Sequence, residues 1–257
     1  MRLALASLVF LTGCGGSTGS ALVTFSGEAS GPTDAIAPLS FTTGVGAAVT
    51  LTAAKLHLGA VYLNQSVPAS GAAASPCVSP GIYVGQVFGP VDVDLLSPTA
   101  VPFPSAGEGT ETRARTAEVW LTGGDVNASA DSTVILDVAG TAAQAGVSYP
   151  FTAAVTIGAN RTPQVTNPAM PGASPICHQR IVTPILVDIT PRNGGMLELQ
   201  IDPRSMFDSV DFSQATKVTD EPLMYQIPDT SDGPGGALFK GLTANFGVYA
   251  FTFHEPG

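Results

Sequence analysis

Short runs rich in Val, Ile, Thr, Phe and Tyr recur along the chain, separated by clusters of Gly, Pro, Asn or Asp. Such runs between turn-forming residues are typical of β-strands. Apolar and polar positions alternate most clearly over residues 247–254, where Tyr249, Phe251 and Phe253 fall on one face. The pattern predicts strands at Leu22–Ser26, Val49–Leu63, Ile82–Leu96, Ala117–Leu121, Thr133–Ala139, Tyr149–Ile157, Ile181–Ile189, Met196–Asp202, Ala237–Leu242 and Gly247–His254.

About ten strands with turn clusters throughout predict an all-β fold, an antiparallel β-sandwich with long Pro/Gly loops and little helix. The best helix candidate is residues 202–210, where Asp202 can cap and Pro203 suits the first helical position. Asn193-Gly194-Gly195 is a strong hairpin signal between two of the predicted strands. Trp120, the only tryptophan, lies within an alternating strand and is predicted to be in the core, which argues against a carbohydrate-binding surface.

The first 20 residues have a composition unlike that of the rest. Arg2 is followed by an apolar run, Leu3 to Leu11, that is too short to span a bilayer. Small residues close the run, as they do in a secretory signal peptide. The quartet Leu11-Thr12-Gly13-Cys14 resembles the lipobox of bacterial lipoproteins. An ordinary cleaved signal with a chance Cys at position 14 is the alternative.

The resemblance implies that residues 1–13 are removed and that Cys14 becomes the acylated N-terminus. It also implies a membrane-anchored protein of a bacterial cell envelope, and Gly15 after the Cys fits an outer-membrane destination better than an inner-membrane one. Two or three acyl chains hold a protein stably on a membrane surface. Residues 14–21 then form a Gly/Ser-rich tether, and residues 22–257 form a single β domain.

The net charge limits the classes of binding partner, and the cysteine count predicts a disulfide. The formal net charge is −10, so nucleic acid and anionic lipid surfaces are not expected as partners. Of the three cysteines, lipidation of Cys14 leaves Cys77 and Cys177. In the oxidising compartment outside the inner membrane, an even pair predicts a disulfide.

Sequence motifs for catalysis are few. The chain offers no nucleophile elbow, because its Gly-x-Ser-x-Gly match, residues 15–19, lies in the Gly/Ser-rich tether and not between a strand and a helix. A His-Glu-x-x-His zinc motif is absent. His57, His178 and His254 are the candidate ligands of a metal site, and together with Met170, Met196, Met206 and Met224 they would suit copper. Calcium could use Asp202, Asp208 and Asp211, or Asp92 and Asp94, although a solvated acidic face is the simpler interpretation.

These observations favour a lipid-anchored envelope protein that is not an enzyme and serves as a binding or structural β module, with no resident cofactor. A copper-type metal-binding lipoprotein is the alternative, and an anchored hydrolase is a third hypothesis.

Overall fold

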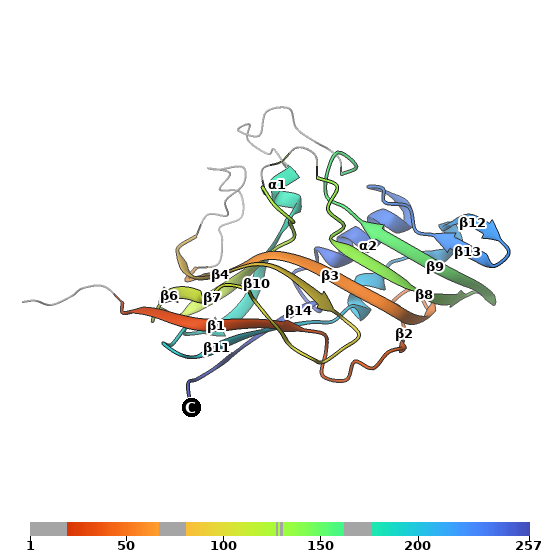
Figure 1. Cartoon of the computed structure of the whole chain (residues 1–257). Helices are drawn as coiled ribbons and strands as arrows, with labels where there is room; N and C mark the ends of the chain where they lie inside the picture. The colour runs from red at the N-terminus through yellow and green to blue at the C-terminus, as the bar shows by residue number, and fades with distance from the viewer. Residues whose placement is uncertain (1–19, 67–80, 127, 129–130, 162–175) are drawn as a thin grey trace, which may run out of the picture.

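The computed structural model describes residues 20–66, 81–126, 128, 131–161 and 176–257. The predicted β-rich fold is confirmed: in these residues 14 strands join one large mixed sheet (Figure 1). The strands are β1 (Leu22–Ser30), β2 (Leu39–Thr42), β3 (Ala48–Asn64), β4 (Tyr83–Asp94), β5 (Val101–Pro102), β6 (Gly107–Thr110), β7 (Ala114–Trp120), β8 (Leu136–Gln144), β9 (Val147–Val155), β10 (Ile181–Ile189), β11 (Met196–Ile201), β12 (Thr216–Asp220), β13 (Leu223–Gln226) and β14 (Tyr249–His254).

The helical elements are short. They are α1 (Ile176–Gln179), the 3-10 turns η1 (Arg204–Phe207) and η2 (Phe212–Gln214), and α2 (Gly233–Leu242). No helix in the described ranges is both long and apolar enough to cross a membrane.

The sheet differs from the predicted antiparallel sandwich in two respects. Its strands are hydrogen-bonded in one path, β12-β13-β9-β8-β3-β4-β6-β1-β11-β14, with β2, β5, β7 and β10 beside it. Two pairs, β1 with β11 and β13 with β9, are parallel. Strand β3 is 17 residues long and can therefore pair with several other strands along its length. It connects strand groups that would form two separate sheets in a sandwich.

The long strand β3 organises this arrangement. Its first half pairs with β2 and β8, and its second half pairs with β4 and β7. The strand path curls, so that β14 at one end contacts β10, which pairs with β7. Figure 1 shows β1 and β11 running below β3, β4 and β7. Apolar side chains of both groups, including Phe25, Val61, Val119 and Leu199, belong to one buried cluster.

The 3-10 turns and α2 cover the other end of the sheet. Phe151 of β9 packs against Phe207 and Phe212, with ring centroids 6.0 and 4.9 Å apart. Burial of such rings supplies a large share of core stabilisation. Of the helix predicted over residues 202–210, the structure contains only the four-residue 3-10 turn η1. The buried ring of Phe207 holds this turn against the core.

Two local predictions are wrong. Residues Ala237–Leu242 are the end of α2, not a strand, because Leu238 and Leu242 are buried one helical turn apart. Asn193-Gly194-Gly195 does turn the chain, with Gly194 at φ 77°. However, β10 pairs with β7 whereas β11 pairs with β1 and β14, so the turn carries the chain between strand groups and closes no hairpin.

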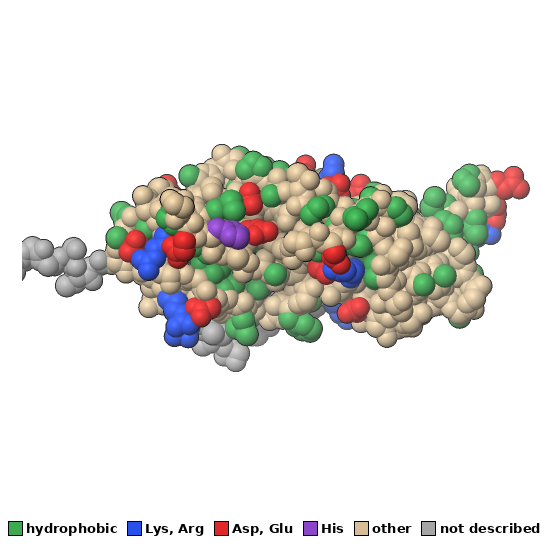
Figure 2. All heavy atoms as spheres, turned by 90° about the horizontal axis from the view of Figure 1, so that it is seen from below, with side chains coloured by type: hydrophobic (Ala, Val, Ile, Leu, Met, Phe, Trp, Pro, Cys, Tyr) green, Lys and Arg blue, Asp and Glu red, His purple; other side chains and the backbone are tan. Residues whose placement is uncertain are grey.

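Charged side chains are sparse, and several of the basic ones are paired with acidic neighbours. On the face seen in Figure 2, acidic and basic side chains lie in small mixed groups among uncharged residues. Arg204, for example, contacts both Asp34 and Asp202. These exposed pairs contribute little stability individually.

Candidate functional site: an aromatic groove on the sheet

The outward-facing side of β3, β4 and β7 carries four aromatic rings. Strand register determines which residues share this side: Tyr62 lies opposite Glu118 of β7 and Gln86 of β4, and Ala60 lies opposite Trp120 and Phe88. The intervening residues Val61, Val87 and Val119 point into the core and are buried. Alternation along each strand therefore separates an apolar interior from a mixed polar and aromatic outer face.

Tyr62 is the centre of this aromatic cluster, which consists of Tyr62, Tyr83, Phe88 and Trp120. Its ring centroid lies 4.7 Å from that of Trp120, 5.3 Å from that of Tyr83 and 6.0 Å from that of Phe88. The Tyr83 and Phe88 contacts are edge-on, and the Trp120 contact is tilted by 40°. These are favourable geometries for aromatic pairs. The rings hold one another in place while Phe88 stays 42% exposed.

Glu118 is a fully buried carboxylate beside the aromatic cluster. Its Oε2 accepts a hydrogen bond from Trp120 Nε1 at 3.1 Å and another from the Tyr83 hydroxyl at 3.3 Å. Its Oε1 accepts from Asn64 Nδ2 at 3.2 Å. A buried carboxylate is tolerated only when hydrogen bonds replace its hydration. Glu118 therefore orients the polar edges of two rings.

The same carboxylate affects the nearby phenol. Burial raises the pKa of Tyr62, and the negative charge of Glu118 raises it further. Both effects disfavour the phenolate. A phenol is protonated at neutral pH even without this shift, so the Tyr62 hydroxyl can both donate and accept a hydrogen bond.

A groove of about 330 Å³ opens beside these rings and is called the aromatic groove. Its lining contains no charged side chain among the described residues: Gly59, Ala60, Tyr62, Phe88, Gly89, Pro90, Trp120, Thr122, Gly123 and Gly124. The pairing of β3 with β4 is irregular between Leu58 and Ala60. Gly59 lies at this irregularity, and a Cβ there would lie 2.6 Å from the Thr122 carbonyl oxygen. The hollow thus depends on a backbone approach that a side chain would prevent.

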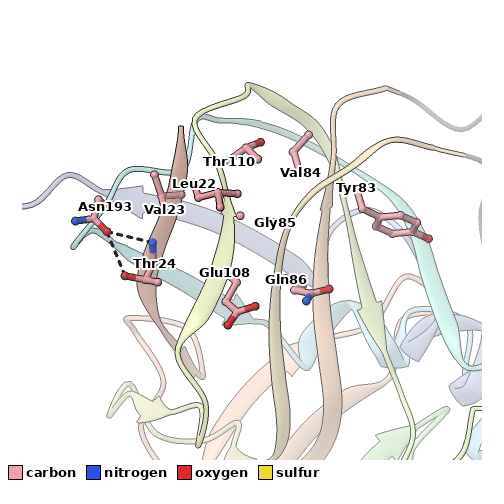
Figure 3. A pocket seen from close by; sticks show the side chains of 11 residues that line it. Leu22, Val23, Thr24, Tyr83, Val84, Gly85, Gln86, Glu108, Thr110 and Asn193 are labelled. Carbon is pink, nitrogen blue, oxygen red and sulfur yellow. Dashed lines mark hydrogen bonds between the residues drawn. The ribbon is translucent and has the colours of Figure 1, made fainter. Parts of the chain in front are cut away.

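A second hollow, the edge groove, lies over β1, β6 and β4 and has a volume of about 530 Å³ (Figure 3). Thr24 pairs with Glu108 across β1 and β6, and Glu108 pairs with Gln86 across β6 and β4. Asn193 closes one end, where its Oδ1 accepts from the Thr24 backbone N–H and hydroxyl. Tyr83 lines the edge groove and also contacts Tyr62, so the two grooves adjoin.

The three predicted metal-ligand histidines do not converge. His57 Nδ1 lies 2.7 Å from Asp92, and His254 Nε2 lies 2.8 Å from Glu198 on a different strand pair. His178 is in α1. The described residues contain no group of three His, Cys, Asp or Glu side chains that could hold a metal ion.

The other candidate ligands are also dispersed. Met196 is on β11, Met206 is buried in η1 and Met224 is on β13, whereas Met170 lies outside the described residues. Among the acidic candidates for calcium, Asp202 binds Arg204, and Asp211 accepts from Ser213 in the cap of η2. Asp208 is exposed, and Asp94 accepts from the Leu96 backbone N–H.

His57 and Asp92 have the arrangement of a base with an orienting carboxylate, as hydrolases use. Such a base needs a nucleophile at its other nitrogen. Among the described residues His57 Nε2 is buried and has no hydrogen-bond partner. The pair therefore lacks an assembled nucleophile in this part of the chain.

Of the cysteines predicted to carry the lipid and to form the disulfide, the structure describes Cys177. Cys14 and Cys77 lie outside the described residues, and Cys177 is buried at the second position of α1. Both the lipid anchor and the Cys77–Cys177 bridge stay predictions.

Sequence reasoning missed the aromatic site. Trp120 was expected in the core, but it lies on the outer face and is partly exposed, because its strand neighbours Val119 and Leu121 take the inward positions. Strand alternation places Tyr62 and Trp120 at outward positions in their own strands. What the pattern does not contain is the pairing of β3 with β4 and β7, which brings the rings together.

Comparisons with known proteins give no further guidance: no family model, no curated protein and no solved structure matches this chain.

Proposed function

We propose that this chain is a lipid-anchored protein of the bacterial envelope whose β domain binds a ligand at the aromatic groove and is not an enzyme. The observation that carries the binding role is the partly exposed ring pair of Tyr62 and Trp120, which are 4.7 Å apart in the wall of an uncharged groove. Concave apolar sites with a few oriented polar groups are the usual form of ligand-binding sites.

The polar groups around the groove support binding over catalysis. The Glu118 carboxylate already accepts three hydrogen bonds, two of them from rings of the aromatic cluster. A carboxylate held in this way is suited to positioning rings. A copper site and a hydrolase are less well supported, because His57, His178 and His254 lie on separate elements.

The anchor is tested first. If residues 11–14 act as a lipobox, we expect wild-type protein to fractionate with membranes. Mass spectrometry should then find an acylated Cys14 at the mature N-terminus. Cys14→Ser is expected to abolish acylation and release the domain from the membrane. An unmodified N-terminus at another residue, with wild-type protein in the soluble fraction, would contradict the anchor.

The binding role is tested with the fluorescence of Trp120, which is the only tryptophan of the chain. The full chain in detergent is titrated with three ligand classes: neutral oligosaccharides, proline-rich peptides and medium-chain fatty acids. One class is expected to give a saturable change that Phe88→Ala weakens. Phe246→Ala is the matched control, because Phe246 is 79% exposed and lines a different pocket. If no class binds in a Phe88-dependent manner by fluorescence or calorimetry, the proposed binding role is wrong.

A further inference from the structure

We infer that the ligand is a neutral carbohydrate chain that stacks in the aromatic groove and extends across the sheet to the edge groove. The inference rests on the proposed binding function and adds the ligand class and its path. It also reverses the expectation from sequence that a chain with one tryptophan offers no carbohydrate-binding surface. Trp120, Tyr83 and Phe88 all pack around the ring of Tyr62, so the aromatic cluster extends the apolar surface that a single ring would provide.

The first argument is the shape and chemistry of the groove wall. A sugar ring has an apolar face of C–H groups and a rim of hydroxyls, and the apolar face can pack on an aromatic ring. Trp120 and Phe88 both line the aromatic groove and both are partly exposed. The glycines Gly123 and Gly124 form an exposed rim without side chains, so a flat ligand can approach the rings closely.

The second argument is charge. Of the residues that the structure describes, none lining the aromatic groove is charged, and Glu108, whose carboxylate is exposed, is the charged one lining the edge groove. The chain as a whole carries a formal charge of −10. A phosphorylated or carboxylated ligand would meet repulsion without a basic partner in either groove. A neutral ligand matches both grooves.

The third argument is a row of available hydrogen-bonding groups. Tyr62, Gln86 and Glu108 lie directly opposite one another on the adjacent strands β3, β4 and β6. Among the described residues these three side chains make no hydrogen bond to another protein group, whereas their neighbours Thr24 and Glu118 are engaged. Adjacent strands are roughly 4.8 Å apart. The row therefore offers a hydroxyl, an amide and a carboxylate at regular steps from one groove to the other.

This row favours a carbohydrate over the main rival, a proline-rich peptide. The Glu108 carboxylate only accepts hydrogen bonds, so its partner must donate. Sugar hydroxyls donate and accept, and they occur on every ring of a glycan. A proline residue has no backbone N–H to donate. A peptide of prolines can stack on the rings but cannot satisfy the carboxylate equally well.

The test measures Trp120 fluorescence and heat of binding on the full chain in detergent. The probes are β-1,4-glucose, α-1,4-glucose and β-1,4-N-acetylglucosamine oligomers, each as disaccharide and hexasaccharide, and a proline-rich decapeptide. At least one hexasaccharide series is expected to bind. Phe88→Ala should weaken it by about three- to tenfold, the range that corresponds to one lost aromatic contact. Phe246→Ala should leave the affinity within about twofold of wild type.

Two substitutions in the polar row test the path of the chain. Glu108→Gln and Gln86→Leu should weaken the hexasaccharide several-fold and leave the disaccharide unchanged, because a disaccharide occupies the aromatic groove alone. Equal melting temperatures of variants and wild type exclude a folding defect. A hexasaccharide affinity that neither substitution changes would overturn the extended path.

The outcomes separate this inference from the proposed function. If no oligosaccharide binds but the decapeptide or a fatty acid binds in a Phe88-dependent manner, the glycan inference is wrong and the binding role stands. If nothing binds, both fall.

Discussion

Arg161 and Asp229 form an ion pair in which the arginine side chain is only 1% exposed and the aspartate is 25% exposed. The guanidinium also donates to the backbone oxygens of Thr156 at 3.0 Å and Thr230 at 2.6 Å. It lies 4.2 Å above the Phe239 ring of α2. This cluster joins the segment after β9 to the segment that begins α2 and to the Phe239 ring of α2.

Removing one partner of this pair should destabilise the fold strongly. Asp229→Ala leaves the Arg161 charge buried, which costs about 3–5 kcal/mol in the free energy of unfolding. Arg161→Met with Asp229→Ala removes both charges and should recover part of that loss. Urea unfolding of the single and double variants measures both effects. A loss below about 1 kcal/mol for Asp229→Ala would show that the pair behaves like an exposed one.

Gly241 of α2 is predicted to be intolerant of any side chain. A Cβ at this position would lie 2.2 Å from the Met206 carbonyl oxygen of η1. We expect Gly241→Ala to destabilise by about 1–3 kcal/mol through overpacking, although Ala favours helix. Gly124→Ala is the control, because a Cβ there meets nothing within 4 Å. Thermal unfolding should shift only for Gly241→Ala; equal shifts for both would refute the packing argument.

A small part of the acid dependence of stability should come from exposed arginine–aspartate pairs, each of which contributes little by itself. The hydrogen bond from Arg204 lowers the pKa of Asp34, and that from Arg113 lowers the pKa of Asp188. Because the folded pKa lies below the unfolded value of about 3.9, this contribution is present above that pH and is lost as pH falls through the folded pKa. Urea midpoints measured from pH 6 to pH 2 should fall in the acid range. Arg204→Gln should make the decline shallower, and an identical decline would contradict the assignment.

The Cys77–Cys177 bridge would close a loop of about 100 residues, for which chain entropy gives about 4–5 kcal/mol. Protein purified without reductant should show no titratable thiol once Cys14 is acylated. A reductant, or Cys177→Ser, should lower the melting temperature. Two titratable thiols in the untreated protein would show that the bridge does not form, and Cys177 would then act as a small buried apolar residue.

Metal removal should leave the fold unaffected, since the described residues assemble no set of three metal-ligating side chains. We expect the same melting temperature before and after treatment with a chelator that binds copper, zinc and calcium. A fall of many degrees that one added metal reverses would support the metal-binding alternative. Elemental analysis of protein purified without chelator provides an independent check.

The sequence by itself determined the β class and the position of most strands. The predicted Ile181–Ile189 coincides with β10, and Met196–Asp202 and Gly247–His254 fall within two residues of β11 and β14. Alternation of apolar and polar residues is a local property, so it can be recognised without knowing which strands pair. Short apolar runs are ambiguous, which is why Ala237–Leu242 was mistaken for a strand.

Only the tertiary structure decided which strands are neighbours. The parallel pairing of β1 with β11, and the separation of β10 from β11 across the Asn193 turn, depend on contacts between segments distant in sequence. The candidate site has the same origin. Tyr62, Phe88 and Trp120 come from three strands, and their side chains meet because the register places Ala60 opposite both Phe88 and Trp120. Pairing and register depend on long-range packing, and a single sequence pattern does not contain them.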